Sequence, residues 1–377
     1  MKKGWEIKTL GEVCDKASSN IAQNKLNDNE GIYPIYGASG FIKNIDFYQQ
    51  ENEYIAIVKD GSGVGRVTLY PEKSSVLGTL QYIIPNEKVT TRYIYYFLNS
   101  IDFDKYKCGA AIPHIYFKDY SNESIPIPPI KEQEEIVERL DKGFELIDSL
   151  KETAKKNLYN AKELFQSVLR EELSPKQGWE TKTLGEVAQI KGGNAFKSQD
   201  FIKSGKYQVL RMGNVKPGLI KENENPVYIN EIQKEALEKA LLRVNDIVIT
   251  QTGTRYKRDY GYTAIINKEN YLLNQRLSLI RLNKGFSPFF YLYYTWSDYF
   301  KDQFFKNETG TVGQGNVGIQ AIYNAVVPIP ELKEQEEIVN RLDRIKGYCE
   351  ELEGNYKRVL ELCEELKQGL LREAFSY

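Results

Sequence analysis

Few side chains in this sequence have the type and spacing that catalysis requires. The chain holds a single histidine, His114, so a zinc site built from several histidines cannot form. A Ser-His or Cys-His nucleophile would have to use this one residue, and no acid-plus-nucleophile pattern stands near it. No pair of acids is spaced as a nuclease would need. We therefore expect no catalytic residue and no metal or cofactor site on this chain.

Two short segments imitate cofactor motifs. Residues 61–65 (GSGVG) resemble a nucleotide-binding loop, but such a loop must open a helix. The residues that follow, 66–70 (RVTLY), favour a strand and end at Pro71, which predicts a hairpin. Residues 225–228 (NPVY) imitate an adenine methyltransferase signature but lack its second proline. We interpret them as a turn.

Side chains suited to nucleic acid are more abundant. Residues 250–258 (TQTGTRYKR) place hydrogen-bond donors and three cations around a glycine. Arg and Gln suit bidentate contacts to guanine and adenine, whereas Lys and Thr suit phosphates. In the C-terminal half we predict DNA contacts from Arg211, Asn214, Gln251, Thr252, Thr254, Arg255, Tyr256, Lys257, Arg258, Asn274, Arg276, Gln314 and Asn316. In the N-terminal half we predict them from Lys59, Ser62, Arg66, Gln81, His114, Tyr116 and Lys118. Each could instead be a surface residue or a turn former.

The charge distribution agrees with a polyanionic partner. The formal net charge is −1, but residues 175–330 carry +7, while residues 131–174 and 331–377 carry −3 and −4. The four cysteines have no C-x-x-C spacing, which predicts free thiols in a reducing cytoplasm. The first residues lack the apolar run of a secretory leader, and no stretch approaches ~20 apolar residues. We expect a cytoplasmic protein.

The elements that carry these side chains come from an internal repeat. Residues 4–13 (GWEIKTLGEV) recur at 178–187 (GWETKTLGEV), an offset of 174. Residues 126–141 (PIPPIKEQEEIVERLD) recur at 328–343 (PIPELKEQEEIVNRLD), an offset of 202. Between the matching ends only an outline survives: an apolar strand before a glycine turn, and a glycine (Gly109, Gly310) ahead of the Pro-Ile-Pro segment. One scaffold with two different contents is what two different reading surfaces require.

Each copy ends in a long predicted helix with apolar residues at 4-3 spacing. The seam positions begin at Ile136 and Ile338 and continue for several heptads, and prolines precede each helix. Cys349 and Cys363 fall at seam positions, which predicts buried core residues. The two helices are each other's obvious partners, and antiparallel pairing would place the domains at opposite ends. A helix of about 43 residues spans ~65 Å, which limits the reach to roughly 19 base pairs.

The ordered double repeat resembles the specificity (S) subunits of Type I restriction–modification enzymes over nearly the whole chain. The paired P-I-P-x-x-K-E-Q-E-E-I-V-x-R-L-D segments and the G-W-E-x-K-T-L-G-E-V starts carry this resemblance. It implies an α+β fold with two α/β target-recognition domains, at 1–128 and 175–330, and two conserved helices, at 129–174 and 331–377. These helices would form an antiparallel coiled coil with pseudo-twofold symmetry.

The same resemblance implies a non-catalytic DNA-specificity subunit whose domains each read one half of a bipartite double-stranded DNA target. The helices would set the gap and dock two methyltransferase (M) subunits, and restriction (R) subunits would complete the nuclease. S-adenosylmethionine and ATP would bind those partners. A self-contained restriction–modification enzyme and a coiled-coil adaptor that binds only proteins are the alternatives. The missing catalytic constellations argue against the first, and the basic second domain argues against the second.

Overall fold

Two compact units make up the chain. The computed structural model describes residues 4–109, 111–311 and 313–376. The first unit is Met1–Lys156 with Tyr356–Tyr377, and the second is Asn157–Asn355. Each unit therefore combines one recognition domain with segments of both long helices, α4 (Ile130–Leu173) and α10 (Leu332–Phe375). The predicted α+β class is confirmed.

The first recognition domain is built on a mainly antiparallel framework. Its central sheet has the order β2-β8-β5-β6, a second sheet has the order β4-β3-β7, and β1 pairs with β9. The middle strand β5 (YIAIV) is buried at every position, as expected for a strand covered on both faces. The bounds are β1 Glu6–Thr9, α1 Leu10–Val13, β2 Cys14–Ser18, β3 Tyr33–Gly37, β4 Gly40–Ile45, β5 Tyr54–Val58, β6 Val67–Tyr70, β7 Ser75–Val76, β8 Leu80–Pro85, α2 Thr91–Ser100, α3 Phe117–Tyr120 and β9 Ser124–Ile127.

The second recognition domain repeats this topology. Its sheets have the orders β11-β20-β16-β18 and β15-β12-β19, and β10 pairs with β22. In both domains the three-stranded sheet contains one parallel pair, β3 with β7 and β12 with β19. The bounds are β10 Glu180–Thr183, α5 Leu184–Val187, β11 Ala188–Gly192, β12 Tyr207–Leu210, β13 Val215–Lys216, β14 Leu219–Ile220, β15 Tyr228–Ile229, α6 Lys234–Ala240, β16 Ile247–Thr250, β17 Thr252–Gly253, β18 Thr263–Ile265, β19 Tyr271–Leu273, β20 Leu277–Leu282, α7 Pro288–Trp296, α8 Asp298–Lys306, β21 Gly315–Asn316, α9 Ile319–Tyr323 and β22 Val326–Ile329.

Neither cofactor-like segment forms a cofactor loop, although the second is a turn only at its start, because its last residue, Tyr228, begins β15. The GSGVG segment lies in the turn between β5 and β6, which pair as an antiparallel hairpin from Tyr54↔Tyr70 to Ile57↔Val67. No helix follows it, so its amide groups do not form the phosphate cradle of a nucleotide loop. The NPVY segment leads into β15, and Asn225 takes a left-handed conformation with φ 49°, as turn residues do.

The joint between each domain and its helix is duplicated in atomic detail. A buried glutamine in the first turn of each long helix makes two side-chain hydrogen bonds. Its amide N–H donates to a proline carbonyl, and its amide oxygen accepts from the backbone N–H of the N-cap residue of α2 or α7. Gln133 does so with Pro128 and Thr90, each at 2.9 Å. Gln335 does so with Pro330 at 2.8 Å and Ser287 at 2.9 Å. The indole N–H groups of Trp5 and Trp179 likewise donate to Glu132 and Glu334 at 3.0 Å. These bonds fix the exit direction of each helix.

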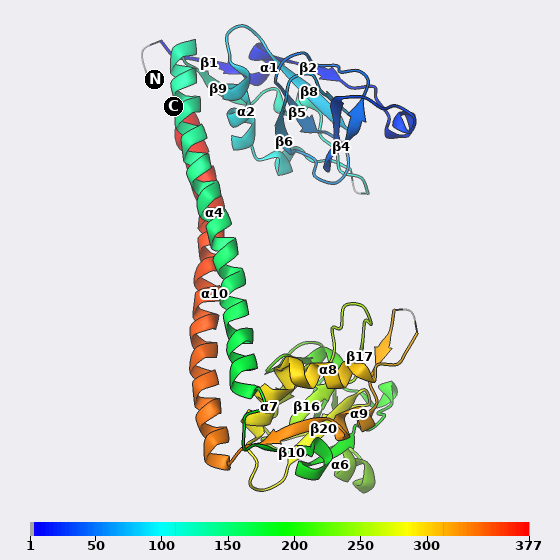
Figure 1. The fold of residues 1–377 in the computed structure, drawn as a ribbon. Coiled ribbons are helices and arrows are strands. Elements are labelled where there is room, and N and C mark those ends of the chain that lie inside the picture. The colour runs from blue at the N-terminus through cyan, green and yellow to red at the C-terminus, as the bar shows by residue number, and fades with distance from the viewer. Residues whose placement is uncertain (1–3, 110, 312, 377) are drawn as a thin grey trace. The chain divides into compact units, whose positions relative to one another are not determined.

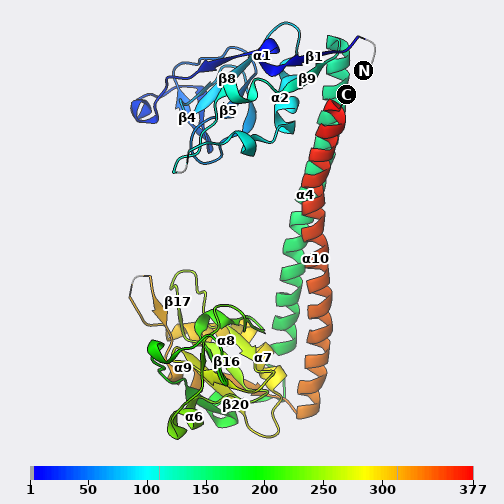
Figure 2. The same cartoon turned by 180° about the vertical axis from the view of Figure 1, so that it is seen from behind.

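Within each unit the two long helices run antiparallel, as Figures 1 and 2 show from opposite sides. In the first unit Lys367 contacts Asp148 at 2.5 Å, and Lys151 contacts Glu364. Residue numbers therefore rise along α4 while they fall along α10. In the second unit Arg341 holds Glu172 through two bonds of 2.8 and 2.9 Å. The predicted antiparallel pairing is therefore confirmed, and the buried Cys349 and Cys363 are confirmed as core residues.

Each domain core is completed by the end of the helix from the other repeat. Leu371, Ala374 and Phe375 at the end of α10 belong to the core of the first domain. Leu169 and Leu173 at the end of α4 belong to the core of the second domain. By the 202-residue offset that relates the copies, Leu169 is equivalent to Leu371, and Leu173 is equivalent to Phe375. The repeat is thus reciprocal: each copy supplies the last helical turns that bury the apolar surface of the other.

The predicted 4-3 seam is only half correct. Ile147, Ala154 and Ala161 are buried along α4, but the intervening leucines of the predicted seam are 38–52% exposed: Leu150, Leu164, Leu352 and Leu366. Two helices offer only a narrow contact stripe, so these positions turn outward. Gly143 admits Leu370 to the seam, because Leu370 Cδ1 would lie only 2.9 Å from a Cβ added at this glycine.

Candidate nucleic-acid interface

The predicted side chains of the first domain gather where a turn meets a hairpin. The first-domain turn (residues 59–66) joins β5 to β6, and the first-domain hairpin spans residues 108–114, of which 110 lies outside the described residues. The Gly61 N–H donates to the Pro113 carbonyl at 2.9 Å, and Ile115 N–H donates to the Lys59 carbonyl at 3.0 Å. Cys108 and His114 exchange backbone bonds of 2.9 Å. These bonds bring Lys59, Ser62 and His114 to one edge of the first domain, the edge formed by the turn and the hairpin.

Aromatic contacts extend this edge along the chain. The His114 ring lies edge-on to Tyr116, with centroids 4.9 Å apart, and the Lys118 ammonium lies 5.4 Å from the Tyr116 ring centre. Tyr116 is exposed. A cation over an exposed aromatic ring, next to a histidine, suits a phosphate-lined groove.

The side chains of two predicted residues of the first domain are engaged by other parts of the domain. Arg66 is exposed, but its Nη1 donates to the Ala38 carbonyl at 2.8 Å, toward the β3–β4 turn. Gln81 is 5% exposed and its amide donates to the Tyr120 hydroxyl at 3.3 Å, inside the sheet. The polarity of Gln81 in the sequence marked it as a candidate, whereas its strand position commits the side chain to the core.

The second domain builds the same frame with different residues. In the first domain Asp60 bridges His114; in the second, β17 pairs with β21 through Thr252↔Asn316 and Gly253↔Gly315. The second-domain hairpin spans residues 309–316, of which 312 lies outside the described residues, and Thr309 bridges Asn316 as Cys108 bridges His114. A turn that meets a hairpin is therefore repeated at the level of backbone hydrogen bonds, although almost no side chain is shared.

The second-domain loop (residues 251–262) is longer than its counterpart and closes on itself. Asp259 accepts from the Thr254 N–H at 2.5 Å and from the Thr254 hydroxyl at 3.1 Å, and these bonds lower the pKa of the Asp259 carboxyl. The Arg258 guanidinium covers the Phe305 ring at 4.7 Å. The closed turn presents Lys257 and Tyr256 outward, and Tyr256 is 79% exposed.

Other predicted residues of the second domain connect to this loop through the backbone. Gln251 N–H donates to the Arg276 carbonyl at 2.9 Å, and the Gln251 amide donates to Val317 at 3.0 Å, beside Asn316. Asn274 N–H donates to the Leu210 carbonyl at 3.2 Å, next to Arg211. Arg276 takes a left-handed φ of 74° and is exposed. Gln314 is exposed on the hairpin.

Two of the polar side chains predicted in this domain serve the interior. Asn214 is 2% exposed; it accepts from Arg211 N–H at 2.9 Å and donates to the Lys221 and Glu224 carbonyls at 3.1 and 2.8 Å. Thr252 is buried and its hydroxyl lies 2.6 Å from the Met212 sulfur. Arg211 itself reaches the Asn225 carbonyl at 2.6 Å. These bonds organise the loops instead of facing a ligand.

Sequence reasoning missed the partners that hold the loop. Glu308, Gly310 and Phe305 contact Arg255 or Arg258, and none was a candidate. Gly109 and Gly310 were the available signal, because both glycines precede the Pro-Ile-Pro segments by a similar distance. Both take left-handed φ values, 90° and 125°, that shape the two hairpins.

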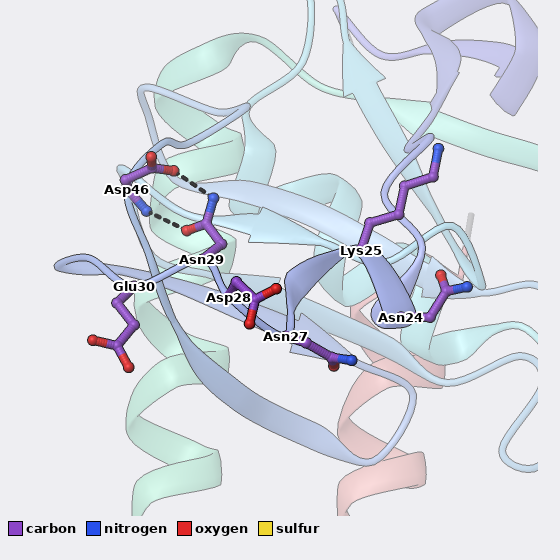
Figure 3. Close-up of a pocket in the computed structure, with 7 residues that line it drawn as sticks. All are labelled: Asn24, Lys25, Asn27, Asp28, Asn29, Glu30 and Asp46. Carbon is purple, nitrogen blue, oxygen red and sulfur yellow. Dashed lines mark hydrogen bonds between the residues drawn. The ribbon is translucent and has the colours of Figure 1, made fainter.

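One hollow in the first domain has the wrong charge for DNA. Figure 3 shows its lining, which encloses about 720 Å³ and carries Asp28, Glu30 and Asp46. Asn29 and Asp46 bond each other at 2.7 and 3.0 Å, while the Asp28 and Glu30 carboxylates point in different directions. Carboxylates repel phosphates, so this hollow is a poor DNA site.

A comparison with protein families identifies the chain. The family model described as Type I restriction modification DNA specificity domain matches residues 2–159 and 176–362. The chain belongs to this family. Each matched range covers one recognition domain of the specificity protein and part of the helix that follows it, so the internal repeat and the family boundaries coincide.

Curated relatives of this specificity protein carry the same description. It is 27% identical over 380 residues to the type I restriction enzyme MjaVIII specificity subunit of Methanocaldococcus jannaschii, covering 92% of this chain and 87% of the relative. It is 25% identical over 366 residues to the putative specificity subunit S.HindORF215P of Haemophilus influenzae, covering 90% and 87%. The chain is therefore a DNA sequence specificity subunit of the type I restriction–modification class.

Solved structures share the fold. One, from work on complex assembly and conformational transition of the type I R-M system, has a TM-score of 0.76 at 19% identity and covers 99% of this chain and 98% of its own. The HsdS subunit from Thermoanaerobacter tengcongensis has a TM-score of 0.57 at 19% identity, covering 99% and 97%.

Two other features are absent from the part of the chain that the structure describes. Across the described residues, no three His, Cys, Asp or Glu side chains gather as metal ligands. Within those same ranges, no helix has the length and apolar character needed to cross a membrane.

Proposed function

We propose that this chain is the non-catalytic subunit that directs a separate methyltransferase to a double-stranded DNA target in two parts. Each recognition domain would read one half-site, and the long helices would set the gap. One observation carries the proposal: both domains repeat the same turn-and-hairpin backbone, yet His114 stands where the second domain has Asn316. Constant geometry with different side chains is the requirement for reading two different sequences.

The chemistry of the two edges suits DNA. Lys59, His114 and Lys118 in the first domain, and Arg255, Lys257 and Arg276 in the second, offer donors to phosphates and base edges. Since the second domain carries +7 and the region of the first carries −1, the second would supply most of the electrostatic attraction.

Docking of two methyltransferase subunits would use the outward faces of the helices. The first unit exposes Leu146, Leu150, Leu362 and Leu366, and the second exposes Tyr159, Leu164, Tyr348 and Leu352. The repeat offset relates Leu146 (72% exposed) to Tyr348 (57%), and Leu150 to Leu352. Duplicated apolar patches on acidic helices favour two copies of one partner that offers apolar side chains with a basic rim.

The bond-making chemistry would then belong to the partners. S-adenosylmethionine would bind the methyltransferase, which would flip an adenine out of the duplex and methylate it. ATP would serve the restriction subunits. The specificity chain would contribute selection and placement alone.

Methylome sequencing of a methylation-free host tests this function. The host would express the chain together with its methyltransferase, and a matched host would express the methyltransferase alone. We expect a split motif, two short defined halves around a fixed gap, only when the chain is present. Normal expression of both proteins without new modification, and without target-specific DNA binding by the complex in a gel shift, would contradict the proposal and favour a protein-binding adaptor.

Native mass spectrometry of the complex tests the docking patches. Leu146→Asp and Tyr348→Asp should each reduce the count of bound methyltransferase subunits from two to one, because a charge would be buried without a partner. Glu145→Gln, next to Leu146 on the exposed surface, is the matched control and should keep both. Two subunits bound to both aspartate variants would exclude these patches.

A further inference from the structure

The Glu308 carboxylate lies where the second-domain loop meets the second-domain hairpin. Its Oε2 lies 3.8 Å from Arg255 Nε, while Arg255 Nη1 donates to the Gly310 carbonyl at 3.4 Å. The Tyr260 hydroxyl donates to the same carboxylate. We propose that Glu308 is a positioning residue that fixes the Arg255 guanidinium for base reading, and so determines specificity at the second half-site. This inference rests on the proposed DNA-reading role of the loop.

The surroundings of Glu308 distinguish it from an ordinary surface ion pair. Its side chain is 11% exposed, and Tyr260, which holds it, is 2% exposed. Burial, and then the neighbouring Glu308, raise the pKa of the Tyr260 hydroxyl above its ordinary value. The hydroxyl therefore remains a protonated donor, and the carboxylate has a fixed position from which to act.

Two glycines make room for this arrangement. A Cβ at Gly315 would overlap the Tyr260 hydroxyl and the Glu308 carboxylate, and a Cβ at Gly253 would come within 2.8 Å of the Tyr260 ring. Gly253 and Gly315 are paired directly in the β17–β21 ladder. The frame that joins loop and hairpin is thus shaped to admit the carboxylate–tyrosine pair beneath Arg255.

A fixed guanidinium reads bases more selectively than a mobile one. A free arginine side chain samples many rotamers, and an exposed arginine loses that entropy when it binds. Contacts at Nε and Nη1 remove part of that loss in advance and restrict which face of the planar group points outward. A bidentate contact to guanine depends on that orientation.

Among the residues of the first domain that the structure describes, no arginine of the turn is held by a buried carboxylate in this way. Near the base of its hairpin, Lys105 contacts Glu123 at 2.5 Å and Tyr106 bonds the same carboxylate, but Glu123 leads into β9 and not into the turn. Arg66 of the turn donates to the Ala38 carbonyl at 2.8 Å and forms no ion pair with a carboxylate among the described residues. The inference therefore concerns the second half-site only.

Methylation rates of the complete complex test the inference. Glu308→Gln keeps an oxygen that accepts from Tyr260 but removes the charge that holds Arg255. We expect the rate preference for the intact target over single-base changes in the second half-site to fall about tenfold. Preference at the first half-site and the thermal unfolding midpoint should not change. Glu269→Gln, an exposed acid of the same domain, is the control.

A double-mutant cycle separates positioning from a purely structural role. In an Arg255→Ala background, Glu308→Gln should add no further loss, since the group it positions is gone. Equal losses with and without Arg255, or no loss from Glu308→Gln at all, would overturn the inference while leaving the proposed function intact. If Arg255→Ala itself leaves second-half-site discrimination unchanged, the loop assignment fails as well. Should Glu308→Gln fold poorly, Tyr260→Phe gives the same test by releasing Glu308 and should show a smaller loss of the same kind.

Discussion

The two recognition domains share a backbone frame but stabilise it by different means. On the central sheet of the first, tyrosine rings pack together: Tyr54 stacks on Tyr70 with centroids 5.6 Å apart and meets Tyr82 edge-on at 5.2 Å. In the second, Arg281 holds the buried Asp246 through bonds of 2.7 and 2.6 Å. The same strand order, β2-β8-β5-β6 and β11-β20-β16-β18, survives this change. Backbone pairing and helix joints therefore define the frame, and the side chains between them can differ.

The turn-and-hairpin edges that we propose to read DNA differ more between the two domains than the backbone frames do. The first-domain turn is short and its cations come from several places, whereas the second-domain loop concentrates Arg255, Lys257 and Arg258 in one closed turn. We expect the second domain to dominate affinity, and the first to contribute a larger share of its binding through specific contacts.

The largest expected effect comes from the reciprocal helix ends. Phe375 packs edge-on against Tyr93 and Phe97 at 5.2 and 5.4 Å, so Phe375→Ala should destabilise the first unit by about 3 kcal/mol. Leu173→Ala at the equivalent position should cost the second unit about the same. Hydrogen exchange in α2 and α7 measures each unit separately.

Each substitution should affect only the unit whose core its side chain enters. Phe375→Ala should accelerate exchange in α2 and leave α7 unchanged, and Leu173→Ala should do the reverse. Faster exchange in α7 but not α2 on substitution of Phe375 would contradict the reciprocal packing.

Arg255→Ala should produce the next largest effect. Loss of a bidentate base contact should remove about 2 kcal/mol of discrimination at the second half-site, with the first half-site unaffected. His114→Ala is the counterpart and should alter the first half-site alone. Methylation of targets with single-base changes in either half measures both. Equal loss at both half-sites from Arg255→Ala would show that this loop is not assigned correctly.

The sequence predicted the repeat, the helices and the loops more accurately than the individual contacts. Long identities and the heptad period depend on many residues at once, so they survive local exceptions. A single polar residue gives no such redundancy: Gln81, Asn214 and Thr252 look like ligands in the sequence but lie buried in strands or turns. Glu308 was invisible because its importance comes from Tyr260 and Arg255, which are distant from it in the chain.

Lys257→Ala should have a smaller effect on affinity that is the same for every sequence. An exposed lysine that meets a phosphate releases counterions, so its loss should lower the slope of log affinity against log salt by about 0.9. Lys118→Ala gives the corresponding value for the first domain. Titration of the methyltransferase complex with target DNA at several salt concentrations measures both slopes. A changed base preference with an unchanged slope would assign Lys257 to base reading instead.

The smallest expected effect is a pH dependence that distinguishes the α4–α10 helix contacts of the two units. Arg341 hydrogen-bonds Glu172 and thereby lowers the pKa of that carboxyl below its ordinary 4.5. In the first unit the repeat offset places Ala374 where Glu172 stands, so this pair has no counterpart there. Because the folded pKa is depressed, the pair contributes fully above the unfolded pKa, and its contribution is lost as pH falls through the folded value.

The contribution should be about 0.5 kcal/mol, since the Arg341 side chain is 40% exposed and solvent screens the pair. Denaturant unfolding of Glu172→Gln and the parent chain, compared from about pH 7 down to about pH 4, measures it. The difference in unfolding free energy should be largest at neutral pH and shrink on acidification. A difference that stays constant across this range would mean that packing of the Glu172 side chain, and not its charge, stabilises the contact between α4 and α10 in the second unit.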